Sequence, residues 1–367
     1  MLPHQTWRMN SLEHQIHYPL GDTLPGEGAT VTIAPGVKWV RMGLPFALDH
    51  INLWLLRDQQ RDDKSGEIRD GWTVVDCCID SASTRAQWEQ IFEHCLEGLP
   101  VLRVIVTHMH PDHIGLAHWI CERWGVRLWI SATDYNAARI GIYDQNGFGD
   151  EAGADFYIAH GAQDEAFLAH VRGRSSYYPT LVPALPPTYR RMMDGFSVEI
   201  GGRQWLCISG YGHAPEHIAL YNKDLLILIS GDMVLPRIST NVSVHAMEPE
   251  ADPLRLFLTS LRCYLDLPND TLVLPSHGKP FKGLHERIRQ LQDHHHDRLS
   301  DILQASVHSA LSAVDVLPIL FKRVLDTHQM TFALGEALAH LHLLWFDGRL
   351  RRHIDNQGIY RFQHGGD

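Results

Sequence analysis

The sequence predicts an α/β fold, in which sheets are covered by helices, followed by a small helical C-terminal domain. From about residue 30 to residue 280, short apolar or β-branched runs alternate with stretches of helical period. Past residue 283 the pattern changes to long helical stretches. Such alternation is typical of sheets covered by helices. We therefore place a first domain at residues 1–284 and a helical domain at residues 285–367.

The apolar runs predict strands, and the segments between them predict helices. The clearest runs cover residues 53–56, 72–75, 102–106, 126–130, 205–208, 225–229 and 271–274. Residues 83–96 and 253–265 show the apolar period of amphipathic helices. Residues 172–194 are rich in proline and tyrosine. They predict a long irregular segment that either shapes a substrate pocket or serves as a surface linker.

The C-terminal region predicts two helices and a hairpin. The helices cover residues 285–304 and 331–346, and two strands follow around an Asn-Gln-Gly turn at residues 356–358. The run His294-His295-His296 lies inside the first of these helices. Because neighbouring residues of a helix do not face each other, we interpret this run as a solvated face, not a metal site.

Composition and charge exclude several classes of protein. The hydrophobic share of 44% and the charged share of 20% are those of a globular protein. A net charge of −11 disfavours general attraction to nucleic acid or to anionic membranes. The sequence has neither a signal-peptide pattern nor a membrane-length apolar run. Six cysteines without a Cys-x-x-Cys pair favour a reduced, cytoplasmic protein, with Cys77 and Cys78 buried.

Histidines concentrate where one predicted strand ends. Of the 25 histidines, three lie with an aspartate in Thr-His-Met-His-Pro-Asp-His at residues 107–113. Alternate residues of an extended segment point the same way, so His108 and His110 can hold one metal ion together. A turn at Pro111 then directs Asp112 and His113 toward a second ion.

Three further apolar runs each end in a potential metal ligand. These ligands are His213, Asp232 and His277. His217, four residues beyond His213, is an alternative to it. We prefer His213 because it follows the glycine nearer to the strand end.

These residues together resemble the metallo-β-lactamase superfamily and its His-x-His-x-Asp-His signature, over about residues 30 to 285. The resemblance implies an αββα sandwich, in which two mixed sheets are flanked by helices. It also implies two ions, the first held by His108, His110 and His213, the second held by Asp112, His113 and His277, and both bridged by Asp232. The usual Asp-Thr-Gly motif is here Asp76-Cys77-Cys78, and Asp76 would orient the ligand loop from outside the ligand set.

This ligand set predicts hydrolysis by a metal-bound hydroxide, with Asp112 and Asp232 as the catalytic carboxylates. Mixed nitrogen and oxygen ligands suit zinc best, with iron and manganese as alternatives. An aspartate at the bridging position resembles the branch of glyoxalase II, related thioesterases and phosphodiesterase-like nucleases. We therefore expect a small-molecule ester or thioester as substrate, although the basic glutathione-binding pattern of glyoxalase II is missing.

Two alternatives stay open. The last eighty or so residues resemble the winged-helix-like domain of the lactamase-β-like protein 2 type, a single-strand endoribonuclease. Against this, residues 285–367 are nearly neutral, so a nucleic acid is not the favoured partner. The other alternative is a metal-binding module without catalysis. A homodimer is compatible with the sequence, which does not reveal the oligomeric state.

Overall fold

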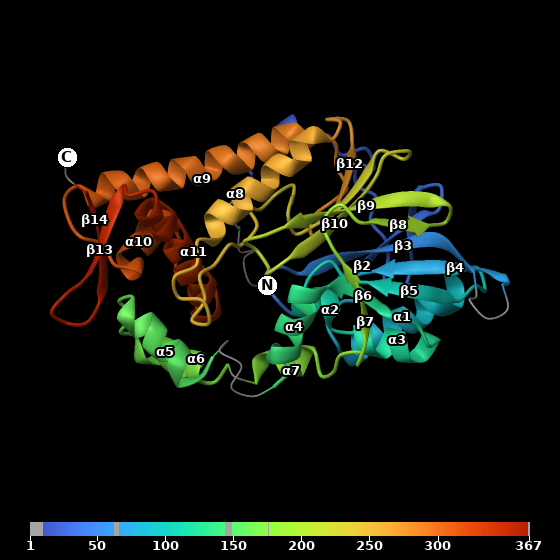
Figure 1. Ribbon diagram of the computed structural model, residues 1–367, viewed down its shortest axis with the longest axis horizontal. Coiled ribbons are helices and arrows are strands. Elements are labelled where there is room, and N and C mark those ends of the chain that lie inside the picture. The colour runs from blue at the N-terminus through green and yellow to red at the C-terminus, as the bar shows by residue number, and fades with distance from the viewer. Residues whose placement is uncertain (1–9, 62–65, 144–148, 175, 366–367) are drawn as a thin grey trace.

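The computed structural model describes residues 10–61, 66–143, 149–174 and 176–365. Two β-sheets pack face to face, and helices cover the outer side of each (Figure 1). A helical region with a terminal hairpin lies at one end of this sandwich. None of the helices in the described ranges combines the length and the apolar character that crossing a membrane requires.

The first sheet is mixed. The strands up to β4 pair antiparallel, and those from β4 onward pair parallel. In the described part of the chain its order is β1 (Val31–Ala34), β2 (Val37–Gly43), β3 (His50–Arg61), β4 (Ile68–Val75), β5 (Val101–Ile105), β6 (Leu128–Ser131) and β7 (Tyr189–Met192).

The second sheet is also mixed, because β11 and β12 are parallel while its other pairs are antiparallel. Its order is β12 (Leu272–Pro275), β11 (Ile227–Gly231), β10 (His217–Asn222), β9 (Arg203–Gly210) and β8 (Ser197–Ile200). All seven apolar runs predicted as strands overlap strands of these two sheets. The C-terminal hairpin, β13 (Leu350–Ile354) and β14 (Tyr360–His364), is confirmed as well.

The helices form three groups. Beside the first sheet lie α1 (Ala82–His94), α2 (Pro111–Ile114), α3 (Ala117–Trp124) and α4 (Ala132–Gly141). Then come α5 (Asp150–Ala159), α6 (Glu165–Arg172) and α7 (Tyr177–Leu181). The last group is α8 (Pro253–Cys263), α9 (Leu284–Ser306), α10 (Ala313–Leu320) and α11 (Thr327–Phe346), and the short 3-10 helices are Glu13–Gln15 and Tyr264–Asp266.

Three apolar cores correspond to the layers. Between the sheets, Trp39 and Trp54 of the first sheet meet Trp205 and its neighbours on the second, and all three are at most 2% exposed. A second core joins the first sheet to α1, α3 and α4. A third runs from the second sheet through α8 and α9 into α10 and α11. This layering confirms the αββα sandwich, with the helical C-terminal region continuous with one outer layer.

The prediction of a long irregular segment at residues 172–194 was wrong in part. This stretch contains α7 and the edge strand β7. Pro179 lies in the first turn of α7, where proline is tolerated because its missing N–H has no helical partner. The hydroxyl of Tyr178 donates a hydrogen bond to the carbonyl of Met109 at 2.6 Å. The segment is thereby attached to the loop that carries the histidine motif.

The solvated face predicted for His294-His295-His296 was also wrong for its central residue. His295 is fully buried, and its Nδ1 lies 3.2 Å from Nε2 of His340 on α11. The ring of Phe257 on α8 is 5.8 Å from the His295 ring. Because α8 and α11 both pack on α9, this position lies in a core, which the local sequence pattern alone does not reveal.

Candidate metal centre

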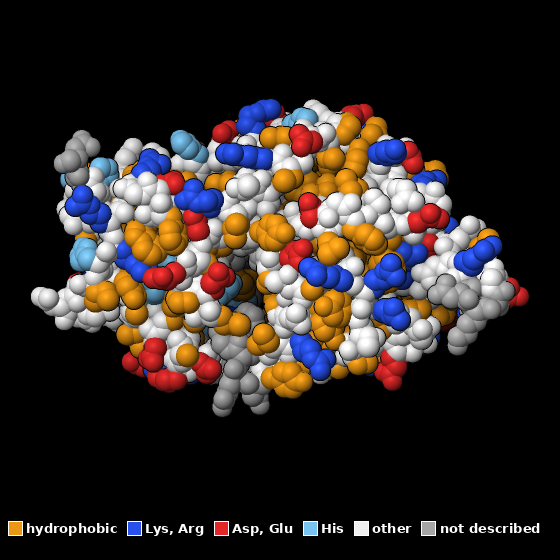
Figure 2. Space-filling view, in the orientation of Figure 1, with side chains coloured by type: hydrophobic (Ala, Val, Ile, Leu, Met, Phe, Trp, Pro, Cys, Tyr) orange, Lys and Arg blue, Asp and Glu red, His pale blue; other side chains and the backbone are white. Residues whose placement is uncertain are grey.

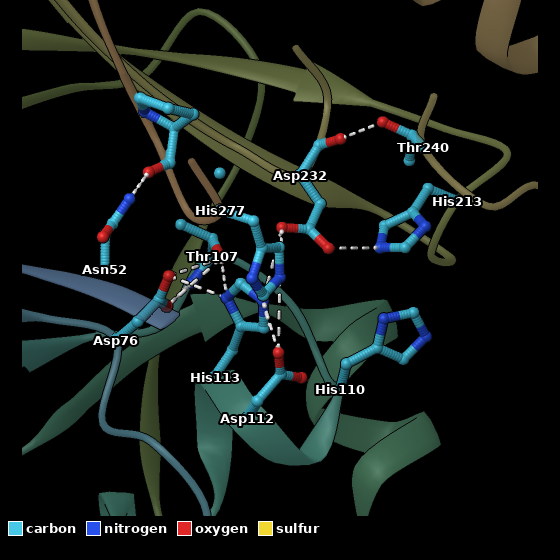
Figure 3. A network of polar contacts seen from close by, with 12 residues as sticks. Asn52, Asp76, Thr107, His110, Asp112, His113, His213, Asp232, Thr240 and His277 are labelled. Atoms are coloured by element: carbon cyan, nitrogen blue, oxygen red, sulfur yellow. Dashed lines mark hydrogen bonds and ion pairs between the residues drawn. The ribbon is translucent and has the colours of Figure 1, made fainter. Parts of the chain in front are cut away.

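The predicted ligands come together at one edge of the sandwich, where strands from both sheets end. The histidine motif follows β5 of the first sheet, and His213, Asp232 and His277 follow β9, β11 and β12 of the second. Their side chains point toward a common centre between the sheets (Figure 3). Residues far apart in the sequence thus meet because the strands carrying them end at the same edge.

One group of ligand atoms comprises those of His108, His110, His213 and Asp232, all within 4.8 Å of one another. His108 Nε2 lies 2.9 Å from His110 Nδ1 and 3.3 Å from His213 Nε2. Asp232 Oδ2 lies 3.2 Å from His213 Nε2. Three nitrogens and one oxygen therefore converge on a single point.

A second group comprises Asp112, His113 and His277, again with atoms within 4.8 Å of one another. Asp112 Oδ2 is 3.4 Å from His277 Nε2 and 3.7 Å from His113 Nε2. The second oxygen of Asp232, Oδ1, lies 3.4 Å from His277 Nε2 and 3.5 Å from His113 Nε2. The carboxylate of Asp232 thus faces both groups, one oxygen toward each.

These donors fit divalent metal ions. Tetrahedral ligands at zinc-like bond lengths lie roughly 3.3 Å from one another, close to the separations seen here. Among the described residues, neither His113 Nε2 nor Asp232 Oδ1 has a hydrogen-bond partner, although both atoms are buried. Buried polar atoms without a partner are costly, and coordination of a cation removes that cost.

The electrostatics of the two groups differ. Burial, together with neighbouring histidines, holds the pKa of His108 and of His110 well below the usual value, so both are neutral and able to bind metal. Burial alone would lower the pKa of His113 and His277, but Asp232 and the other nearby carboxylates outweigh it and raise both. His277 and His113 in turn hold the pKa of Asp232 well below normal, despite its burial.

Asp76 supports the ligand loop as predicted for its position, without joining either group. Its carboxylate accepts hydrogen bonds from the Thr107 backbone N–H at 2.8 Å and from His113 Nδ1 at 2.8 Å. Asp76 and Cys78 adopt left-handed φ angles of 63° and 68°, so a cysteine takes this conformation where the family's motif has glycine. Cys77 and Cys78 are fully buried and belong to neither ligand group.

Backbone carbonyls orient two more histidines. His213 Nδ1 donates to the carbonyl of Asn241, and His277 Nδ1 donates to that of His50, both at 2.7 Å. Each ring therefore presents Nε2 to the centre, since the first nitrogen is engaged. His217, the alternative to His213, is fully buried, and its Nε2 accepts a hydrogen bond from the backbone N–H of Asp232 at 3.2 Å.

Asp134 is a supporting residue that the sequence analysis missed. Its carboxylate accepts from the backbone N–H of Met109 at 2.8 Å and from that of Glu216 at 2.6 Å. Burial raises the pKa of Asp134 to about 6. The side chain thus joins the histidine motif to the loop of His213. The sequence pattern that could have revealed Asp134 is Ser-x-x-Asp at residues 131–134, a helix-capping pattern directly after a predicted strand.

The fold and the metal centre together are those of a metal-dependent hydrolase. Comparison with known proteins identifies the family. The chain belongs to the metallo-beta-lactamase superfamily, whose family model matches residues 66–277. The model described as "Metallo-beta-lactamase-like, C-terminal domain" matches residues 299–365.

Relatives extend over nearly the whole chain. A beta-lactamase domain protein from Burkholderia ambifaria is 53% identical, with 97% of this chain and 100% of that chain covered and a TM-score of 0.90. A metallo-beta-lactamase family protein from Thermus thermophilus is 26% identical, with 91% and 100% covered and a TM-score of 0.73. The chain is also 22% identical to the probable metallo-hydrolase YqjP of Bacillus subtilis (strain 168), covering 88% of this chain and 96% of YqjP. The protein is therefore a metallo-hydrolase of this superfamily.

Proposed function

We propose that the protein is a dinuclear metal-dependent hydrolase of a small ester or thioester, in which water is the nucleophile. The observation that carries this proposal is the position of Asp232. Its Oδ2 lies 3.2 Å from His213 Nε2, and its Oδ1 lies 3.4 Å from His277 Nε2. A single carboxylate that faces two ligand groups, one oxygen toward each, can be a ligand of two adjacent divalent ions.

Two divalent ions held there, zinc by preference and iron or manganese as alternatives, supply an activated water and polarise the oxygen of the bond to be cleaved. His108, His110 and His213 would hold the first ion, and Asp112, His113 and His277 the second. Asp232 would be a ligand shared by both ions. Asp112 and Asp232 are the carboxylates that would border the reacting atoms.

The nearby thiols do not offer an alternative nucleophile. Burial raises the pKa of Cys77 well above normal, and burial raises that of Cys78 as well. Both cysteines are therefore protonated near neutral pH, and both are fully buried. An attack by water needs neither of them.

A small substrate is favoured over RNA. Of the three arginines around β13, Arg352 forms an ion pair with Glu250 and stacks on Trp345, with its guanidinium carbon 3.7 Å from the ring centroid. Its charge is therefore already paired within the protein. The net charge of −11 provides no general attraction for a polyanion. We retain the winged-helix-like assignment of the C-terminal domain, and a cytoplasmic location, as predictions.

The test combines metal analysis with an activity screen. We expect about two equivalents of transition metal per chain, and turnover of acyl esters or thioesters at rates that salt affects little. Asp232→Ala and His110→Ala should each lose bound metal and activity. His118→Ala is the matched control, because His118 lies eight residues beyond His110 but outside both groups.

Three results would overturn the proposal. The first is a purified protein that takes up no transition metal. The second is an Asp232→Ala variant that keeps full activity. The third is salt-sensitive cleavage of unstructured RNA without any turnover of esters or thioesters, which would establish the endoribonuclease alternative instead.

A further inference from the structure

A second polar site lies beside the metal centre, around Arg174 on the connection between α6 and α7. The guanidinium donates a hydrogen bond to the hydroxyl of Thr331 at 2.9 Å and lies 3.5 Å from Nδ1 of His328. It also lies over the ring of Tyr177, at 5.0 Å from the centroid, and over that of Phe332, at 5.9 Å. The side chain is thus fixed by α11 on one side and by the start of α7 on the other.

The charge of Arg174 has no balancing carboxylate among the described residues. Its polar contacts there are a hydroxyl and a ring whose pKa is lowered by burial and by Arg174 itself, so the ring is neutral. Burial also lowers the pKa of Arg174. Arg172, only two residues away, contrasts with this: it pairs with Glu151 at 2.8 Å and approaches Glu165 at 3.8 Å. A largely desolvated cation without an anion is costly, and an anionic ligand would offset that cost.

The segments around Arg174 contact the loops that carry the metal ligands: the hydroxyl of Tyr178 donates to the carbonyl of Met109 at 2.6 Å, and the backbone N–H of Val244 donates to the carbonyl of Gly335 on α11 at 3.1 Å. His245 has an exposed side chain, yet burial lowers its pKa to about 4, with further lowering by Arg174 and His213. The side chain of His245 is thus accessible to solvent, although many protein atoms lie around it. Tyr177 is likewise close enough to Asp112 for that carboxylate to contribute to its raised pKa.

The space-filling view shows a hollow near the middle of the molecule, between the helical end and the sheet sandwich (Figure 2). Aromatic rings form walls beside Arg174. The ring of His328 is 6.5 Å from that of Phe46, 6.1 Å from that of Tyr177 and 5.1 Å from that of Phe332. Such walls suit the organic body of a ligand and not a bare inorganic ion.

We propose that Arg174 binds a carboxylate of the substrate, so that the enzyme selects esters or thioesters with an anionic group away from the bond to be cleaved. This inference rests on the proposed hydrolysis and adds a substrate class to it. A planar guanidinium pairs with a carboxylate through two parallel hydrogen bonds along one edge. In Arg174 the Nη1 group already donates to Thr331, so the carboxylate would bind along the other edge. The site also explains how a protein of net charge −11 attracts an anionic substrate: the positive charge is local.

The test compares substrates that differ only in charge. S-phenyl thiohexanoate would be assayed with the zinc-loaded protein beside two counterparts, one with a terminal carboxylate on the acyl chain and one with a carboxylate on the thiol. Arg174→Gln should lower kcat/KM for at least one charged thioester by roughly 30-fold, because one charge-assisted pair is lost. The neutral thioester should change less than about threefold, and Arg174→Lys should recover part of the loss. Arg172→Gln is the matched control and should behave as wild type.

A binding measurement separates this inference from the proposed function. Calorimetry with hexanamide and with adipic acid monoamide, neither of which requires turnover, should show an Arg174-dependent gain in affinity for the carboxylate compound alone. If the wild type cleaves no thioester, the proposed function fails, and calorimetry still tests the carboxylate site. Equal effects of Arg174→Gln on charged and neutral compounds, or a tenfold preference for a sulfonate over the carboxylate, would overturn the inference.

Discussion

Replacing Asp76 by Asn tests whether this carboxylate supports the second ligand group without binding metal itself. Asn keeps the size of the side chain, and its oxygen can still accept from the Thr107 backbone N–H at 2.8 Å. Its amide nitrogen, however, would face the Nδ1–H of His113, now 2.8 Å from Asp76 Oδ2, so that two donors oppose each other. A lost charge-assisted hydrogen bond of about 1.5–3 kcal/mol corresponds to roughly 10- to 150-fold in affinity. We expect the zinc ion at the His113 group to bind about 30-fold more weakly, and the other ion to change little.

Competition with a chromophoric chelator at neutral pH measures both dissociation constants separately. The matched control is Asp80→Asn, because Asp80 is also a nearly buried carboxylate and accepts two hydrogen bonds from Arg85 at 2.7 Å each. That variant loses an ion pair but should bind both ions as the wild type does. Two dissociation constants within threefold of wild type in Asp76→Asn would refute the supporting role, as would equal weakening by Asp80→Asn.

Two further substitutions test the surroundings of the site and the C-terminal core. A Cβ at Gly212, where φ is +98°, would lie 2.2 Å from a backbone carbonyl oxygen of α8. Gly212→Ala should therefore lower the free energy of unfolding, measured in urea, by roughly 3 kcal/mol. It should also weaken zinc binding, because it displaces His213. Gly98→Ala is the control, because Gly98 also has a positive φ of +72° but an added Cβ would meet no atom within 4 Å, so only backbone strain remains. An equal loss of stability in both variants would contradict the steric explanation. Burial lowers the pKa of His340 from 6.5 to about 4. Between about pH 6.5 and pH 4 the unfolded chain therefore binds a proton at this residue and the folded chain does not. Stability is lost as the pH falls through this range. His340→Gln should therefore reduce the stability difference between pH 7 and pH 5 by about 2 kcal/mol in metal-free protein, and an unchanged difference would show that His340 does not titrate in this way.

Much of the architecture was predictable because it follows from local pattern. Apolar runs such as residues 53–56 and 225–229 became strands, since a buried strand needs a continuous apolar sequence whatever surrounds it. The histidine motif at residues 107–113 lies directly after β5, as its position after an apolar run predicted. These features depend on residues close to one another in the chain.

Other features depend on which distant segments meet, and no local pattern contains that information. The sequence analysis preferred His213 to His217 only for its position beside a glycine. The structure places His213 in the ligand group and His217 against the backbone of Asp232. His295 looked solvated because only the packing of α8 and α11 on α9 buries it.

The sequence by itself therefore determined the layered fold, the ligand types and their order along the chain, because hydrophobic period and strand-end position are local properties. Tertiary structure alone decided that Asp232 faces both ligand groups, that Asp134 joins two loops, and that Arg174 packs against α11 near a segment that contacts the ligand loop. The physical reason is that distances between side chains on separate strands and helices are set by the packing of the whole core.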